Sequence, residues 1–184
     1  MAYKKRKQEV KFKSYYNSPI GTLTLISDGT YLTNLLLENS EFDEETIEEN
    51  NLEIFLKTKN WLTDYFKGKE MNASDLPLKL DGTPFRKLVW NYLINIPYNT
   101  VKTYGNIAKE ISLKMGKNPC AQAIGNAVGH NKIPIIIPCH RVVGNNKNLT
   151  GYTGGISIKM KLLNLEGINI DEYKLPKKGK LKNE

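Results

Sequence analysis

The residues with the greatest chemical potential stand together in the second half of the sequence, where Cys139, His140 and Arg141 follow one another. A thiolate is the reactive form of cysteine, and a free thiol has a pKa of about 8.5, so reaction at neutral pH requires a nearby base or positive charge. The histidine can supply the base and the arginine can supply the charge. The alternative is a packed, inert cysteine, which is the commoner situation for a lone cysteine in apolar surroundings.

The segment that leads to Cys139 is a run of isoleucines framed by Pro134 and Pro138. This pattern predicts a buried, extended and stiff stretch of chain. Adjacent side chains of an extended chain point to opposite faces, so His140 needs a bridging water, or a bend at Pro138, to reach the sulfur of Cys139.

Glu166 is the candidate partner that would fix the tautomer of His140. It ends a predicted helix over residues 157–166, directly before Gly167. A carboxylate at a helix C-terminus opposes the helix dipole at a cost of some tenths of a kcal/mol, which favours a partner that holds it there. A solvated surface glutamate is the alternative.

A second predicted helix, from Pro119 to about His130, has one face almost without side chains. Ala121, Gly125 and Gly129 recur on it every four residues. Glycine in a helix costs about 0.5–1 kcal/mol relative to alanine, so two glycines at this spacing need a reason. Either another helix packs closely on this face, or the face fits against a nucleic-acid backbone or into a narrow groove.

The elements before residue 80 predict a small α+β unit. Short β-rich runs are separated by hairpin signals, of which Asp28-Gly29 is the strongest, and they span residues 13–17, 22–27 and 31–37. Residues 38–53 hold eight acids and no base, which is typical of a solvated loop and helix start. An amphipathic helix pattern then runs from Ile54 to Phe66.

The elements after residue 80 predict a mainly helical unit. Thr83 is a candidate N-cap with Pro84 at the first helical position, and an apolar stripe continues to Ile96. A short helix from Tyr104 is broken at Gly116, before the small-faced helix begins. Two short helices with a tight connection favour a helix-turn-helix.

Composition and charge narrow the class of protein. The chain has 184 residues, which allows one domain or two small ones. Residues 1–81 hold 11 basic and 14 acidic residues, whereas residues 82–184 hold 16 basic and 5 acidic residues. We therefore expect an anionic partner, above all nucleic acid, for the second half. No apolar run reaches the roughly 18 residues of a membrane helix and no signal core is present, so we expect no membrane partner and a cytoplasmic protein. Two cysteines and two histidines without metal-ligand spacing predict no metal site.

The heptad Ile137–Val143, IPCHRVV, resembles the active-site signature of the O6-alkylguanine-DNA alkyltransferases, or methylated-DNA-protein-cysteine methyltransferases. The resemblance runs in order over roughly residues 12–170. The other similar segments are Ser18–Leu25, Gly82–Trp90, Ile96–Tyr98, Thr103–Gly105, Gly151–Gly155 and Leu165–Gly167.

For the fold, the resemblance implies an α+β protein in which a small β-sheet and helix pack on a mainly helical domain with a helix-turn-helix. The expected parts are a flexible basic leader, an N-terminal ribonuclease H-like domain, a C-terminal DNA-binding and alkyl-acceptor domain, and a basic tail, over residues 1–11, 12–80, 81–170 and 171–184.

For the activity, the resemblance implies direct reversal of alkylation damage in DNA. The target guanine is flipped out of the duplex, and the Cys139 thiolate takes the alkyl group from its O6 and keeps it, so each molecule acts once. O4-alkylthymine is a further candidate substrate. The implied partner is double-stranded DNA containing O6-alkylguanine, approached from the minor groove by a monomer, and no cofactor is implied.

Position by position, the resemblance makes Cys139 the acceptor, His140 the water-mediated base and Glu166 the residue that orients it. Asn131 matches the hinge of the active-site segment, and Tyr104 matches the donor of a proton or hydrogen bond to the leaving guanine. The residues expected to contact DNA or the flipped base are Ala121, Gln122, Gly125, Gly129, Arg141, Val142, Tyr152 and Thr153. Gln122 stands where the family commonly has an intercalating arginine, and it brings no cation to that role.

The helix expected to enter the groove carries no Lys or Arg between Pro119 and Asn131. The basic residues on either side of this helix are expected to bind phosphates, whereas the pocket around Cys139 is expected to provide specificity for the damaged base. These flanking basic residues are Lys114, Lys117, Lys132, Arg141 and Lys147.

Two other functions remain open at this point. One is a non-enzymatic relative that binds alkylated guanine and recruits other repair, although such proteins lack the acceptor cysteine. The other is a Cys-His-Glu hydrolase unrelated to DNA, which would require an oxyanion hole and repeated turnover, and which leaves the basic second half unexplained.

Overall fold

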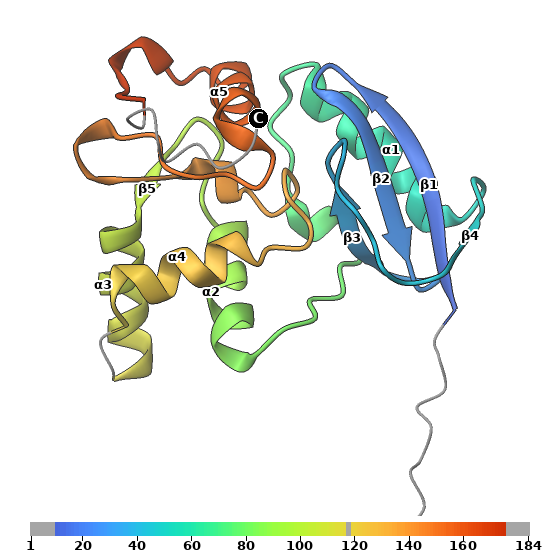
Figure 1. Ribbon diagram of the computed structural model, residues 1–184, viewed down its shortest axis with the longest axis horizontal. Helices are drawn as coiled ribbons and strands as arrows, with labels where there is room; N and C mark the ends of the chain where they lie inside the picture. The colour runs from blue at the N-terminus through green and yellow to red at the C-terminus, as the bar shows by residue number, and fades with distance from the viewer. Residues whose placement is uncertain (1–9, 117–118, 176–184) are drawn as a thin grey trace, which may run out of the picture.

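The computed structural model describes residues 10–116 and 119–175 of the chain, and its N-terminal part is a four-stranded sheet with one helix on it (Figure 1). The sheet order is β3-β2-β1-β4, with β1, β2 and β3 antiparallel. The elements are β1 (Lys11–Ser18), β2 (Gly21–Ser27), β3 (Leu32–Leu36), β4 (Thr46–Glu48) and helix α1 (Glu53–Phe66). The strands and the helix predicted from the sequence are thus confirmed, with ends shifted by one or two residues.

Strand β4 is the exception, because it lies inside the acidic stretch that predicted only a loop and a helix start. Its three residues pair in parallel with β1, where Lys11 lies opposite Thr46 and Lys13 opposite Glu48. The pairing is made by backbone groups of a strand distant in sequence, so neither charge nor local pattern could indicate it. The glutamates that surround β4 are suited to a sheet edge that must not pair with another chain.

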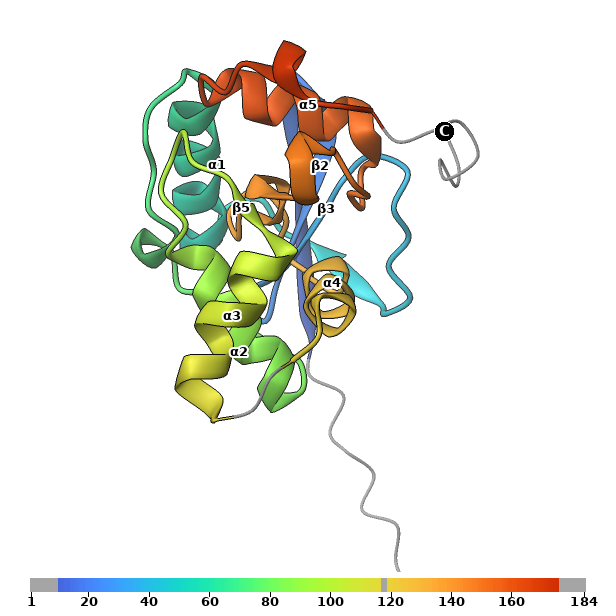
Figure 2. The same cartoon turned by 90° about the vertical axis from the view of Figure 1, so that its left-hand side faces the viewer.

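Among the described residues, the C-terminal part holds four α-helices, short 3-10 turns and a short parallel ladder, arranged as in Figures 1 and 2. Its elements are α2 (Pro84–Ile94), β5 (Lys102–Thr103), α3 (Tyr104–Met115), α4 (Ala121–Gly129), β6 (Val142–Val143) and α5 (Gly155–Leu165). The hydroxyl of Thr83 accepts from Arg86 N, as expected of an N-cap, and Thr103 caps α3 in the same way. Gly116 ends α3 in the left-handed conformation, with φ 63°, and α4 then packs against both α3 and α2.

The segment between α4 and Cys139 is buried as predicted, but it is not extended. Ile135 has φ 74°, which is unfavourable for a β-branched residue, and Ile137 N donates to Ile133 O at 2.9 Å. Cys139–Arg141 form a single 3-10 turn. Burial of the isoleucine side chains on both sides of the bend outweighs the extended preference of the proline-flanked run.

The two parts of the chain share one hydrophobic core, and direct hydrogen bonds join them. Leu35 N on β3 donates to Lys132 O, just after α4, at 2.9 Å, and Tyr98 Oη donates to Gly68 O at 3.3 Å. A Cβ atom at Gly154 would lie 2.4 Å from Leu37 Cδ1, so the loop before α5 lies directly on the N-terminal part. The residues before and after the predicted boundary near residue 80 therefore belong to one folded body.

The predicted terminal segments fall largely outside the described residues. Residues 1–9 of the predicted leader and 176–184 of the predicted tail are not described. The first residues of the predicted tail are packed, since Lys174 N donates to Lys147 O and Leu149 N to Lys174 O. Within residues 10–116 and 119–175, no helix is both long and apolar enough to cross a membrane.

Gly82 offers a test of how the linker holds the helical part. A Cβ atom there would lie 2.5 and 2.7 Å from two ring carbons of Trp90, whose Nε1 donates to Ala127 O of α4 at 2.8 Å. We expect Gly82→Ala to lower the free energy of unfolding by about 1–3 kcal/mol, because the buried indole must shift. Urea denaturation checks this value.

Gly129→Ala is the matched control for Gly82→Ala. A Cβ atom at Gly129 meets no atom within 4 Å among the described residues, and the position is helical. We expect the unfolding free energy to be unchanged or slightly raised, because alanine is the better helix former. Equal effects of the two substitutions would contradict the contact between the linker and Trp90.

Candidate active site

Cys139 lies in the interior, 4% exposed, and the 3-10 turn turns its thiol toward Asn131. The Asn131 side-chain amide donates to Cys139 Sγ at 3.2 Å and to Ile137 O at 2.9 Å, while its oxygen accepts from Ile133 N at 3.0 Å. One buried amide thus holds both the bend and the sulfur. The structure thus places Asn131 against the segment for which it is the predicted hinge.

The thiol faces a cavity of about 440 Å³ between α4, the turn and the loop before α5. Such a volume is within the range of small-ligand sites. Its walls include both glycines of the small helix face, together with Tyr152 and Thr153, which were predicted to close over the flipped base. The lining residues are Tyr104, Gly125, Val128, Gly129, Cys139, Gly151, Tyr152 and Thr153.

The small face of α4 borders the cavity, and the ring of Tyr104, the first residue of α3, lies beside it. The nearest neighbour of a Cβ atom at Gly125 would be the ring of Tyr104 at 3.7 Å, and Gly129 has none within 4 Å in the described part of the chain. Ala121 and Gln122 are exposed on the first turn. Since a Cβ atom at either glycine would meet no described atom closer than 3.7 Å, close helix packing does not account for the glycines.

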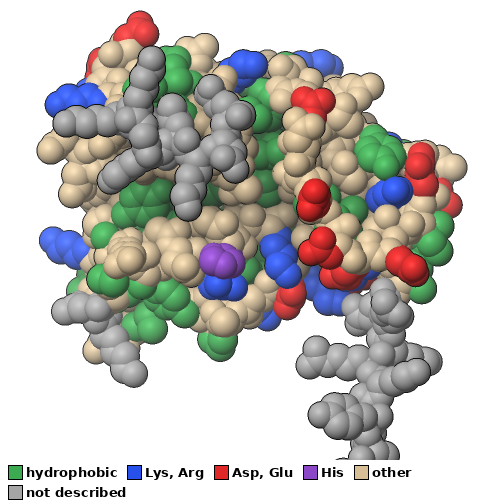
Figure 3. Space-filling view, in the orientation of Figure 1, with side chains coloured by type: hydrophobic (Ala, Val, Ile, Leu, Met, Phe, Trp, Pro, Cys, Tyr) green, Lys and Arg blue, Asp and Glu red, His purple; other side chains and the backbone are tan. Residues whose placement is uncertain are grey.

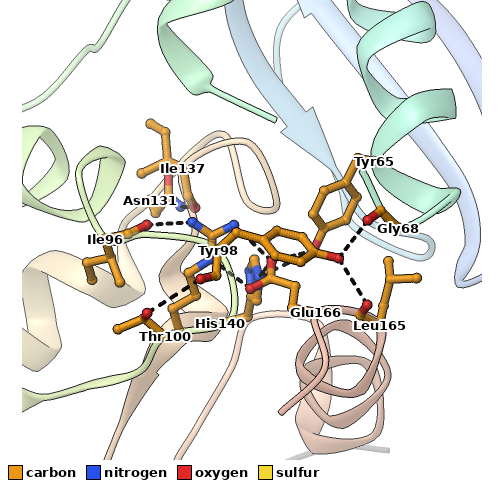
Figure 4. Close-up of polar contacts among 11 residues, drawn as sticks. Tyr65, Gly68, Ile96, Tyr98, Thr100, Asn131, Ile137, His140, Leu165 and Glu166 are labelled. Carbon is orange, nitrogen blue, oxygen red and sulfur yellow. Dashed lines mark hydrogen bonds and ion pairs between the residues drawn. The ribbon is translucent and has the colours of Figure 1, made fainter. Parts of the chain in front are cut away.

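Glu166 is the centre of the polar network shown in Figure 4, and it is 1% exposed. Its Oε1 accepts from Tyr65 Oη at 2.8 Å, His140 Nε2 at 2.7 Å and Arg141 Nη2 at 2.9 Å. Its Oε2 accepts from Arg141 Nε at 2.8 Å, and Arg141 Nη1 donates to Ile96 O. The alternative of a solvated surface glutamate is thus wrong.

These contacts fix the charge states of the network. Burial alone would raise the pKa of Glu166, but the hydrogen bonds and charges of His140 and Arg141 prevail and lower it to about 2. The pKa of His140 is lowered, chiefly by burial and against the attraction of Glu166. The imidazole is therefore neutral at pH 7, with its proton on Nε2, because the carboxylate can only accept. Nδ1 is buried and has no hydrogen-bond partner among the described residues.

The thiol of Cys139 is protonated at rest, because burial raises its pKa, although the Asn131 amide and the charge of Lys159 oppose this effect. Lys159 is fully buried on α5 and donates to Val142 O at 2.5 Å and to Thr150 O at 2.9 Å. Burial lowers the pKa of Lys159 to about 8, so a cation stands near the sulfur at neutral pH. A nucleophilic Cys139 consequently needs a base.

Two members of this site were missed by the sequence interpretation. Lys159 lies among apolar residues on the buried side of α5, and a lysine on an apolar stripe was the available signal. Tyr65 comes from α1 in the N-terminal part, and nothing in its local sequence separates it from the aromatic core residues around it.

The expectation that Arg141 contacts DNA phosphates is wrong, because its side chain is buried and committed to Glu166 and Ile96. Of the other basic residues that flank α4, Lys114, Lys132 and Lys147 are exposed, whereas Lys117 lies outside the described residues. In the view of Figure 3, Lys and Arg side chains are spaced apart around hydrophobic patches, and Asp and Glu gather over the N-terminal part.

Tyr104, predicted to assist the leaving base, starts α3 and lines the cavity. Its hydroxyl lies 3.4 Å from Thr150 Oγ1, and burial raises its pKa, so it remains a proton-bearing donor. Val142 is buried beside the turn, and its carbonyl accepts from Lys159. In the described part of the chain, no three His, Cys, Asp or Glu side chains are arranged to hold a metal ion.

Comparison with known proteins identifies the family of this chain. Residues 84–168 match the model of the 6-O-methylguanine DNA methyltransferase DNA-binding domain, and residues 11–80 match the ribonuclease-like domain of the same family. Among relatives named methylated-DNA–protein-cysteine methyltransferase, that of Haemophilus influenzae is 37% identical over 85% of this chain and 87% of its own. That of Mycobacterium tuberculosis is 44% identical over 82% and 88%.

Solved structures lead to the same family. Mycobacterium tuberculosis OGT in complex with DNA has a TM-score of 0.75 and 38% identity, and the match covers 88% of this chain and 94% of that one. The O6-methylguanine methyltransferase structure from the same organism also has a TM-score of 0.75, with 39% identity over 85% and 93%. The sequence, both domain matches and the fold agree, and the chain belongs to the 6-O-methylguanine DNA methyltransferase family.

Proposed function

We propose that this protein repairs O6-alkylguanine in DNA by transferring the alkyl group to Cys139, once per molecule and irreversibly. The observation that carries the proposal is the buried thiol at the wall of a cavity, with a neutral, carboxylate-oriented imidazole next to it in the chain. Relatives at 37–44% identity bear the name of this activity, which supports the same reaction here.

The proposed step is an in-line displacement at the alkyl carbon. The sulfur of Cys139 forms the new S–C bond while the C–O6 bond breaks, and the electron pair of the C–O6 bond goes to the guanine. The thiol proton passes to Nδ1 of His140, and the guanine gains one proton as it leaves. The product is a thioether, which has no leaving group for hydrolysis, so the thiol is not regenerated.

The orientation of His140 supports a water-mediated transfer. Its Nε2 is occupied by Glu166, so only Nδ1 can accept a proton, and Nδ1 has no partner in the described residues. A water between this nitrogen and the sulfur would satisfy both groups. The imidazolium that results would be stabilised by the ionised Glu166.

The leaving guanine would receive its proton or hydrogen bond from Tyr104. Tyr104 lines the cavity beside Gly125 of α4, and the raised pKa of its hydroxyl keeps that group protonated through the neutral range. The proton that reaches His140 would later restore Tyr104, so no external acid or base is consumed.

Access to a paired base requires that the nucleotide leave the stack, which costs a few kcal/mol. We propose that α4 enters the minor groove with Ala121, Gly125 and Gly129 toward the DNA, and that exposed Gln122 meets the orphaned partner base. The flipped base would lie in the cavity under Tyr152 and Thr153, with backbone groups of Cys139 and Val142 reading its edge. O4-alkylthymine presents the same alkyl carbon and is a second candidate substrate.

Alkylation of Cys139 is the direct test of this proposal. We expect a duplex with one O6-methylguanine to add one methyl mass to the peptide that contains Cys139, up to one equivalent and no further. Cys139→Ala should still bind the duplex and transfer nothing, because only the acceptor atom is lost. Mass spectrometry of digested protein measures both.

Cys120→Ala provides the matched control, because it removes the other cysteine, which is exposed at the start of α4. It should transfer like the parent. Binding of the methylated duplex without any mass shift would contradict transfer and favour a non-enzymatic damage-binding protein. Repeated turnover of an ester or peptide would favour the hydrolase.

The pH dependence of transfer follows from the environment of His140. Its folded-state pKa lies below the ordinary 6.5, so the neutral, proton-accepting form persists as the pH falls through 6.5. We expect the single-turnover rate to decline only at lower pH, and His130→Asn, which removes the exposed histidine, to leave the profile unchanged. A midpoint at or above pH 6.5 would contradict the assignment of the base.

A further inference from the structure

We infer that Tyr65, a residue of the N-terminal part, is a positioning residue of the active site, whose hydroxyl holds the Glu166 carboxylate against His140. The inference deepens the proposed function, on which it rests for the roles of His140 and Cys139. It assigns to the N-terminal part a direct contribution to the chemistry of the C-terminal part.

The position of Tyr65 supports this role. Helix α1 brings the ring into the shared core, where it is 0% exposed, stacks on Trp61 at 5.5 Å between ring centroids and meets Phe66 edge-on at 5.3 Å. These contacts fix the ring, so its hydroxyl has one available direction. In Figure 4 the hydroxyl points from α1 to the carboxylate at the end of α5.

The contacts of the hydroxyl are with the catalytic network itself. It donates to Glu166 Oε1 at 2.8 Å and lies 3.4 Å from His140 Nε2. Oε1 is the same oxygen that accepts from His140, whereas Oε2 is held by Arg141 Nε. Tyr65 thus acts on the half of the carboxylate that orients the imidazole.

The electrostatic setting makes the hydroxyl a fixed donor. Burial and the charge of Glu166 raise the pKa of Tyr65 well above its usual value, so the hydroxyl keeps its proton, and it donates because the ionised carboxylate can only accept. By donating, it withdraws part of the negative charge from Oε1. Without it, Oε1 would be more basic and the imidazole easier to protonate, which would tie up the base before reaction.

Other titratable and charged groups also act on Glu166 and His140, and their effect on the protonation of His140 must be distinguished from that of Tyr65. Arg141 and Lys159 disfavour the imidazolium, and the neighbouring hydroxyls remain protonated. The titratable and charged groups that face Glu166 and His140 are Tyr65, Tyr98, Cys139, Arg141, Tyr152 and Lys159. Tyr65 is the one among them that comes from the N-terminal part.

The test compares Tyr65→Phe with Tyr16→Phe by NMR titration of His140 in a His130→Asn background, where one imidazole remains. Tyr16 is the matched control, because its hydroxyl lies 3.1 Å from Thr63 Oγ1 of the same helix and contacts no active-site group that the structure describes. We expect Tyr65→Phe to raise the titration midpoint of His140 by about half to one unit and Tyr16→Phe to leave it unchanged.

A second variant keeps the packing of the ring and is expected to shift the titration midpoint of His140 in the opposite direction. Replacement of Tyr65 by 3-fluorotyrosine strengthens the donor, so the His140 midpoint should move down. Transfer to Cys139 from a methylated duplex should slow about tenfold in Tyr65→Phe, a loss typical of outer hydrogen-bond partners, with its acid limb displaced in the same direction as the titration.

Parent-like titration and transfer in Tyr65→Phe would overturn the inference and leave Tyr65 a packing residue. A shift of equal sign in both the phenylalanine and the fluorotyrosine variants would overturn it as well. If the titration shifts as expected while the parent itself transfers no alkyl group, the coupling of Tyr65 to His140 stands and the proposed function fails.

Discussion

The structure depends on one buried negative charge. A carboxylate that is 1% exposed is tolerated only if donors surround it, and Glu166 has four donated hydrogen bonds from three side chains. Those donors belong to α1 and to the 3-10 turn, while the carboxylate ends α5. Satisfying this one charge therefore sets the positions of three elements far apart in sequence, and it orients the histidine that follows the proposed nucleophile, Cys139.

The environment of Cys139 balances protection against reactivity. Burial keeps the thiol protonated, so it resists oxidation and indiscriminate alkylation, while Asn131 and Lys159 limit how far its pKa rises. The strained backbone at Ile135 lies in the segment that links Asn131 to the sulfur, and buried isoleucines hold it in place. Rigidity of this segment fixes the sulfur relative to the cavity, which an in-line displacement requires.

Most of the fold could be predicted from the sequence, because turns, caps and helical stripes are local signals. The hairpins, the Thr83 cap and the break at Gly116 were of this kind. Strand β4 was not, since its pairing with β1 depends on backbone contacts between distant segments. Cys139, His140 and Glu166 were found as candidates from residue chemistry and family resemblance, whereas Arg141 was misplaced and Tyr65 missed. Both errors have one cause: local sequence does not reveal which side chains surround a charge that folding buries.

The uncharged face of α4 has a consequence for how damage would be found. Helix α4 contains no Lys or Arg, and its exposed first turn offers only Ala121 and Gln122. Ion pairs with phosphates contribute most to the affinity for DNA and depend most on salt. If this face lies in the groove as proposed, moving by one base pair breaks no ion pair made by the helix. The chain could then survey successive base pairs quickly and pause where a weakened pair lets a base enter the cavity.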